Sequence, residues 1–125
     1  MKKLTELQPE EKRILAAEAC GWICCSDYGS QKFFHNGDML RQVMWPDSSH
    51  HAKLPDYGDD LNAMAEAEAT LTPEEHRLFR AELWRQIERE MPHRIGTAQT
   101  QERAYQSRTA AQRHDAFLLA KGLAE

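Results

Sequence analysis

The stretch Leu54-Pro55-Asp56-Tyr57-Gly58-Asp59-Asp60-Leu61-Asn62-Ala63-Met64-Ala65-Glu66-Ala67-Glu68 joins a restricted turn directly to a capped helix. Pro55 and Gly58 are typical of turns, because proline fixes one backbone angle and glycine adopts angles closed to other residues. Asp59 or Asp60 can accept hydrogen bonds from the first free amide groups of a helix. We therefore predict a helix over residues 60–71.

Three other segments carry helix-start signals. Pro9 followed by two glutamates predicts a helix over residues 9–20, which Gly21 would end. Thr72 with Glu75, and Thr109 with Gln112, form capping boxes that predict helices over 73–91 and 109–121. Apolar residues at helical spacing predict the buried faces of the helices after residue 60. These residues are Leu61, Met64, Ala65, Ala67, Phe79, Leu83, Trp84, Ile87, Met91, Phe117 and Leu118.

Residues 22–45 read as strands instead. The runs 22–25 and 31–35 are rich in strand formers, and Asn36-Gly37 is a tight-turn pair that precedes a third strand within 38–45. Residues 46–58 lack periodicity and are predicted to be an exposed loop. The fold class expected is α+β: a helix-rich single domain over residues 1–125, with a short antiparallel β-meander at about 22–43 packed by flanking helices.

Composition fits a soluble globular protein. A chain of 125 residues with 41% hydrophobic and 29% charged residues suits one domain with its own core. No run is apolar enough for a membrane span, and Met1-Lys2-Lys3 leads into acidic residues rather than an apolar signal core. Three cysteines, two of them adjacent, form no disulfide framework. We expect a cytoplasmic protein with free thiols, no cofactor and no membrane contact.

Charge is distributed unevenly along the chain. Residues 54–76 contain seven acidic residues and no lysine or arginine, whereas residues 77–113 contain eight arginines and four glutamates. One interpretation is that the two segments neutralise each other where they pack. The other is that the acidic segment forms a surface for a basic partner. The candidate contact residues are Asp56, Tyr57, Asp59, Asp60, Glu66, Glu68 and Trp45.

Three pieces of the chain resemble one known family in order. They are Gly21-Trp22, the turn and helix from Leu54 to Glu68, and Thr109-Ala110-Ala111-Gln112-Arg113 before Ala116-Phe117-Leu118. This pattern is similar to that of small phage and prophage proteins of the alpha/beta/alpha (ABA) sandwich family. The resemblance implies a short sheet flanked by helices and a cytoplasmic location in a bacterial host. It brings no catalytic residues.

Cysteine and histidine could in principle form a zinc site from Cys24, Cys25, His35, His50 and His51, with Cys20 nearby. Their spacing is poor, since adjacent strand residues point to opposite faces. Buried thiols beside an exposed histidine loop are the preferred interpretation. Asp56, Asp59 and Asp60 lack the pattern of a calcium loop, and capping accounts for them better.

The sequence contains no phosphate-binding loop, nucleophile elbow or metalloprotease motif, so we expect no enzymatic activity. The arginine-rich half could contact DNA or RNA, but its glutamates and the acidic balance favour a solvated helix face. The function expected is that of a non-enzymatic phage or prophage accessory protein that binds a bacterial host protein, in the sharpest case an anti-CRISPR-like inhibitor of a defence complex. The alternatives are a nucleic-acid-binding regulator and a zinc-stabilised module.

Overall fold

The computed structural model describes residues 1–28, 31–37, 43–46, 52–90, 103 and 105–125. Its helices and strands follow the order expected for an α+β protein, with the strands grouped between the first helix and the later ones. The elements are η1 (Leu4–Glu6), α1 (Pro9–Ala19), β1 (Ile23–Asp27), β2 (Lys32–His35), β3 (Val43–Trp45), β4 (Ala52–Lys53), α2 (Leu61–Glu68), α3 (Pro73–Glu90) and α5 (Ala110–Ala120).

The sheet has the strand order β1-β2-β3-β4. β1, β2 and β3 are antiparallel neighbours, which confirms the meander. The register between β1 and β2 shifts between Cys24 and Ser26, so Cys25 lies at a bulge. β4 pairs with β3 in parallel, with Val43 opposite Ala52. That pairing was not predicted: residues 52–53, assigned to the exposed loop, form a strand instead.

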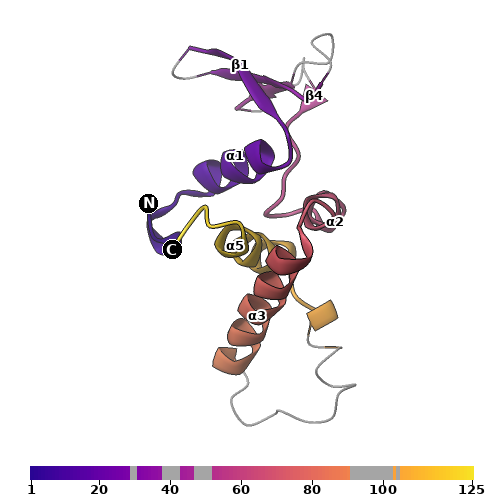
Figure 1. Cartoon of the computed structure of the whole chain (residues 1–125). Coiled ribbons are helices and arrows are strands. Elements are labelled where there is room, and N and C mark those ends of the chain that lie inside the picture. Colours follow the sequence, from indigo (N-terminus) through magenta and orange to yellow (C-terminus); the bar gives the residue numbers. More distant parts are fainter. Residues whose placement is uncertain (29–30, 38–42, 47–51, 91–102, 104) are drawn as a thin grey trace.

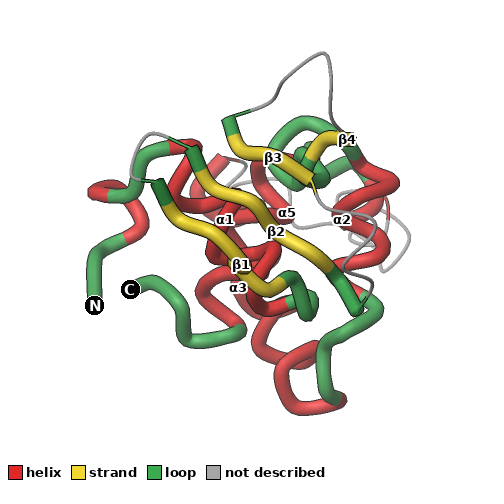
Figure 2. Tube along the Cα trace, turned by 90° about the horizontal axis from the view of Figure 1, so that it is seen from above, coloured by secondary structure: helices red, strands yellow, loops and turns green. Residues whose placement is uncertain are grey.

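The described helices lie on one side of the sheet (Figures 1 and 2). α1 lies next to the sheet, and α5 packs against α1, α2 and α3. In the view of Figure 2 the strands lie in front of the helices, so the described part of the chain forms two layers. α5 is the central helix of the lower layer.

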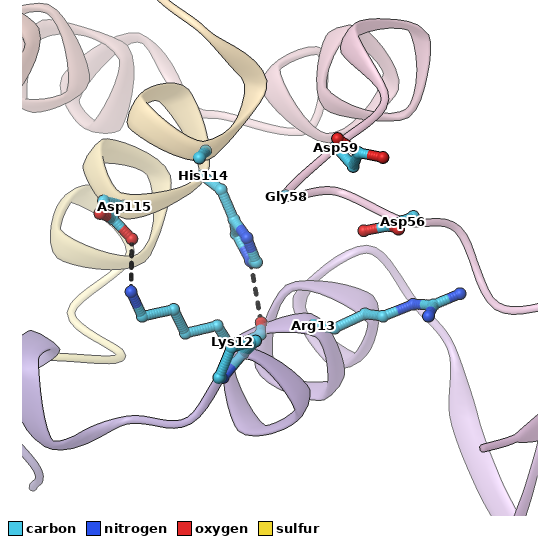
Figure 3. Close-up of a pocket in the computed structure, with 9 residues that line it drawn as sticks. Lys12, Arg13, Asp56, Gly58, Asp59, His114 and Asp115 are labelled. Carbon is cyan, nitrogen blue, oxygen red and sulfur yellow. Dashed lines mark hydrogen bonds and ion pairs between the residues drawn. The ribbon is translucent and has the colours of Figure 1, made fainter. Parts of the chain in front are cut away.

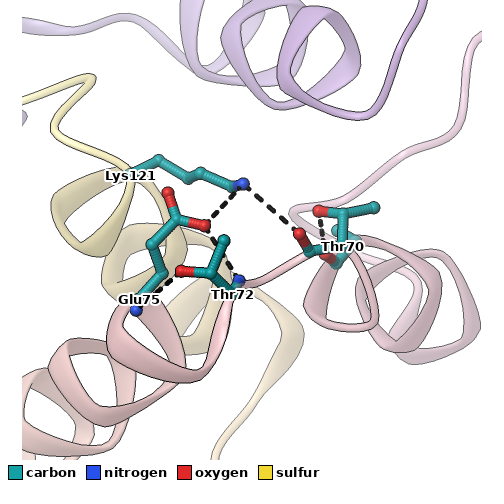
Figure 4. Close-up of polar contacts among 5 residues, drawn as sticks. Thr70, Thr72, Glu75 and Lys121 are labelled. Atoms are coloured by element: carbon teal, nitrogen blue, oxygen red, sulfur yellow. Dashed lines mark hydrogen bonds and ion pairs between the residues drawn. The ribbon is translucent and has the colours of Figure 1, made fainter.

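Local capping defines the helix starts as the sequence predicted. Asp60 accepts a hydrogen bond from the amide of Asn62 at 2.9 Å and caps α2. The Thr72 hydroxyl accepts from the Glu75 amide at 3.1 Å, and the Glu75 carboxylate accepts from the Thr72 amide at 3.0 Å. Lys121, just past α5, donates to the same carboxylate at 2.9 Å (Figure 4). One capping residue therefore also ties α3 to the end of α5.

Two glycines end helices by adopting positive φ. Gly21 follows α1 with φ 97°, and Gly122 follows α5 with φ 71°. In each case the next residue donates its amide back into the last turn, from Trp22 to Ala17 and from Leu123 to Leu118. For α1 this is the glycine-terminated helix end expected from the sequence, and α5 ends in the same way.

The core joins the two layers. Phe34 and Val43 enter it from the sheet, and α5 contributes Phe117 and Leu118, both fully buried. Removing such side chains from water is worth about 1.5–3 kcal/mol each. Other buried members are Ala16, Ala17, Leu54, Tyr57, Ala63, Met64, Ala67, Phe79, Leu83, Ala116 and Ala120.

The buried face of α2 differs from the predicted one. Ala63, Met64 and Ala67 are buried, whereas Leu61 is 56% exposed and Ala65 is exposed. α2 is only eight residues long and ends at Glu68, so its narrow buried stripe contacts the core on one side only. For α3, Phe79, Leu83 and Ile87 are buried as predicted, Trp84 is partly buried, and Met91 lies outside the described residues.

Candidate functional site

A pocket of about 330 Å³ lies between α1, the turn over residues 56–59 and α5 (Figure 3). Its lining combines several ionisable side chains with small residues. Lys12 and Arg13 come from α1, Asp56 and Asp59 from the turn, and His114 and Asp115 from α5. Ligand sites commonly have this form, a concave space with a few convergent polar groups. We therefore treat this pocket as the candidate site.

The two cations of the pocket are already bound by the protein. The Lys12 ammonium forms an ion pair with Asp115 at 2.9 Å, and both side chains are partly buried. The Arg13 guanidinium donates to the Pro55 carbonyl at 3.1 Å and also to the Leu54 carbonyl. In Figure 3 Arg13 points away from the centre of the pocket. Neither cation forms an ion pair with Asp56 or Asp59.

His114 is buried at the inner end of the pocket, with 3% of its surface exposed. Its Nε2 atom lies 2.9 Å from the carbonyl oxygen of Lys12. A carbonyl oxygen only accepts, so Nε2 carries the hydrogen, and in the neutral ring Nδ1 is the acceptor. Burial lowers the pKa of His114, and this favours the neutral ring. The pocket therefore contains a neutral histidine with a defined tautomer.

Gly58 leaves an open position opposite that acceptor. A Cβ atom at residue 58 would lie 3.4 Å from His114 Nδ1 and 3.9 Å from Asp56 Oδ1. Gly58 is not among the described glycines with positive φ, so its backbone does not require glycine. Because glycine has no side chain, a space remains over residue 58. Two acceptors, one on α5 and one on the turn, border that space from different sides.

The acidic segment is partly neutralised and partly free. Glu68 pairs with Arg113 at 2.7 Å and Glu75 with Lys121 at 2.9 Å. Burial raises the pKa of Glu68, and the nearby guanidinium only partly offsets this. Glu68 thus belongs to an internal ion pair with Arg113 and not to a contact surface. The exposed acids are Asp56, Asp59, Asp60, Glu66 and Glu74, and none of them forms an ion pair with a described residue.

The two aromatic contact candidates have structural roles. Tyr57 is 2% exposed, and its ring lies 6.1 Å from that of His114. Burial is the main cause that raises the pKa of its hydroxyl, with Cys20 beside it. Tyr57 therefore belongs to the core, because the turn directs it inward between α1 and α5. Trp45 is partly buried and packs against the core.

The cysteines and histidines proposed for zinc do not gather in the described structure. Cys24 is exposed, and Cys25 donates to the carbonyl of Phe33 at 3.3 Å. His35 is half-buried, while His50 and His51 lie outside the described residues. Within the described ranges, no group of three His, Cys, Asp or Glu side chains could hold a metal ion.

Several arginines of the basic segment stabilise the fold. Arg108 is buried and pairs with Glu90 at 2.9 Å, and Arg113 pairs with Glu68. Arg85 pairs with Glu82 on the same helix, and Arg80 lies 4.4 Å from the centre of the Tyr105 ring. The contacts of Arg80, Arg108 and Arg113 hold α5 and its preceding segment against α2 and α3, whereas the Arg85 pair lies within α3. The charges of Arg108 and Arg113 are therefore used inside the protein.

Sequence reasoning did not select Gly58, His114 or Lys12 for a site. His114 lies three and four residues before Phe117 and Leu118 on α5, a spacing that predicts burial. A buried histidine at that spacing was the available signal, but nothing local connects it to residues about 100 positions earlier. The contact between His114 and Lys12 became visible only in the fold.

Comparison of the chain with protein-family models, curated proteins and solved structures finds no match in any of the three. In the described ranges, every helix is too short or too polar to cross a lipid bilayer. Fold and site together define a small α+β protein with an acceptor-lined pocket beside exposed carboxylates.

Proposed function

We propose that this protein acts without catalysis, by binding another protein through its acidic surface, defined as the carboxylates of Asp56, Asp59, Asp60 and Glu66. The observation that supports this is charge that is exposed and unpaired. All four residues are exposed, and none forms an ion pair with a described residue. Asp60 also caps α2, so one of these charges is fixed in position.

A complementary partner has a basic surface. Opposite charges steer association and increase its rate, and like charges exclude wrong partners. The resemblance to phage ABA sandwich proteins extends the proposal to a bacterial host protein. A defence complex with a basic nucleic-acid-binding surface is its sharpest form, and binding there would make this protein an inhibitor of the anti-CRISPR kind.

The test is affinity capture from a bacterial lysate with matched charge reversals. Asp59→Lys and Glu66→Lys each change the charge as much as Glu88→Lys, and all three residues are exposed. Glu88 lies on α3, outside the acidic surface, and serves as the control. We expect the two acidic-surface variants to retain about one tenth or less of the captured partner, and Glu88→Lys to retain it all.

Binding should also weaken with salt, because exposed charges are screened within about 3 Å at 1 M ionic strength. Circular dichroism spectra of all three variants should match that of the parent protein, since none of the three side chains is buried. A partner captured equally by all three variants, or no specific partner at all, would contradict the proposal.

A further inference from the structure

The space over Gly58 has properties that the acidic surface alone does not explain. It is bordered by His114 Nδ1 on α5 and by Asp56 Oδ1 on the turn, at 3.4 and 3.9 Å from the position that a Cβ would occupy. No described residue donates a hydrogen bond to His114 Nδ1. His114 itself is 97% buried, because only 3% of it is exposed. This acceptor faces the space over Gly58, where the described residues supply no donor, so the space can hold the donor of a bound group.

The charge of the pocket selects the kind of donor. Lys12 is neutralised by Asp115, and the Arg13 guanidinium is bound to backbone carbonyls. Asp56 and Asp59 remain, both exposed and without an ion pair among the described residues. A neutral acceptor and two carboxylates favour a cation with several N–H groups. An anion would be repelled by the Asp56 and Asp59 carboxylates and would find no hydrogen to accept from His114 Nδ1.

We propose that the pocket over Gly58 binds a guanidinium group, contributed by an arginine side chain of the partner protein. The group would donate to His114 Nδ1 and to the Asp56 carboxylate, with Asp59 at the mouth of the pocket. A guanidinium suits this geometry because its donors lie in one plane and can reach acceptors on different walls at once. Its weakly hydrated faces suit the small residues Pro9, Gly58 and Ala111 that also line the pocket. This inference rests on the proposed function and specifies the contact.

The test uses three short blocked peptides: acetyl-Gly-Arg-Gly-amide, the same peptide with lysine, and the same peptide with citrulline. Citrulline has nearly the shape of arginine but no charge. Binding is followed by NMR, through the backbone amide of Gly58 and the imidazole of His114. We expect the arginine peptide to shift both signals saturably. The lysine and citrulline peptides should bind at least about tenfold more weakly than the arginine peptide.

Two variants test whether the peptide binds in the space over Gly58. Gly58→Ala puts a methyl group into the space, and the Gly58 backbone tolerates alanine, so the fold should persist while binding falls at least about tenfold. Asp56→Asn removes one charge at constant shape and should have a similar effect. Glu88→Gln, an exposed acid on α3, is the matched control and should bind as the parent does.

A free ligand is distinguished from a partner side chain by L-arginine itself. Its own carboxylate would lie near Asp56 and Asp59, so it should bind more weakly than the blocked peptide. Tighter binding of free arginine would overturn the assignment to a protein partner, and equal binding of citrulline or lysine would overturn the assignment to a guanidinium. A Gly58→Ala variant with full peptide affinity would also overturn it.

The two proposals can fail separately. If the peptide binds but partner capture ignores Asp59→Lys and Glu66→Lys, the pocket binds a guanidinium, but the acidic surface fails and with it the assignment to an arginine of the partner. If capture depends on the acidic surface but no peptide binds, the function stands and the pocket assignment fails.

Discussion

His114 shows how one hydrogen bond and burial set the chemistry of a residue. The Lys12 carbonyl holds the hydrogen on Nε2, so Nδ1 is an acceptor in the neutral ring. Protonation would add a charge to a ring that is almost entirely buried. The cost of that charge depends on Lys12 from α1, on Asp56 from the turn and on Asp115 from α5.

The lowered pKa of His114 predicts a pH dependence of stability. The folded protein binds the proton less tightly than the unfolded chain, whose histidine titrates near 6.5. The stabilising effect of neutral His114 is therefore complete above pH 6.5 and declines as the pH falls toward the lower pKa of the folded state. His114→Gln keeps a donor for the Lys12 carbonyl but does not titrate, so its stability should fall less on acidification.

Urea unfolding of both proteins at about pH 7.5 and about pH 5.5 checks this difference; both values lie above the range in which most carboxylates titrate. Equal losses of unfolding free energy in the two proteins would show that His114 does not contribute to the pH dependence.

Among elements, the helix starts were predictable and the contacts between elements were not. A capping box is contained within four residues, so Thr72 with Glu75 and Thr109 with Gln112 could be recognised from the sequence. The strand at 52–53 depends on pairing with β3 and has no local signal. The candidate pocket depends on three segments far apart in the chain, and only Asp56 and Asp59 among its residues were predicted to act.

Loss of the α3 cap should be measurable. Thr72→Ala removes the hydroxyl that accepts from the Glu75 amide, and such losses cost about 1 kcal/mol of unfolding free energy. Thr5→Ala is the control, because the Thr5 side chain is exposed and forms no described hydrogen bond. Denaturant unfolding monitored by circular dichroism compares the two variants. Equal stability of the two would mean that the cap is unimportant.

Arg13 connects α1 to the segment that leads into the pocket turn. Its guanidinium donates to two consecutive carbonyls, those of Leu54 and Pro55. Lysine keeps the charge but cannot donate along two directions from one planar group, so Arg13→Lys should lose about 1 kcal/mol or more of unfolding free energy. Chemical denaturation measures it, with Arg77→Lys on the exposed side of α3 as the control. A loss of the same size in both variants would argue against the bridging role of Arg13.

At the scale of the whole molecule, the expected class was correct: a helix-rich α+β fold with an antiparallel meander. It could be predicted because helix and strand patterns occupy separate parts of the sequence. These patterns along the sequence could not predict which helix lies at the centre of the helical layer. α5 contacts α1, α2 and α3, and these contacts depend on the fold as a whole.

Phe34 is the residue that tests whether the two layers unfold together. It is fully buried and reaches from β2 into the shared core. Phe34→Ala should cost about 3–5 kcal/mol. The exposed Ile23 on β1 is the control, and Ile23→Ala should cost about 1 kcal/mol or less.

Tryptophan fluorescence can follow each layer separately. A Trp84→Phe background leaves Trp22 and Trp45 to report on the sheet, and a Trp22→Phe, Trp45→Phe background leaves Trp84 to report on α3. In one cooperative domain Phe34→Ala lowers both unfolding midpoints equally. A shift confined to the sheet signal would mean that the layers unfold independently.

The packing of α1 against α5 has a consequence for synthesis in the cell. Ala16 and Ala17 of α1 are completely buried in the finished protein, and His114 on α5 donates a hydrogen bond from Nε2 to the Lys12 carbonyl. A growing chain displays the apolar side of α1 on the ribosome until the last helix emerges. Stalled or truncated products that lack residues beyond 109 would therefore be substrates for chaperones and proteases.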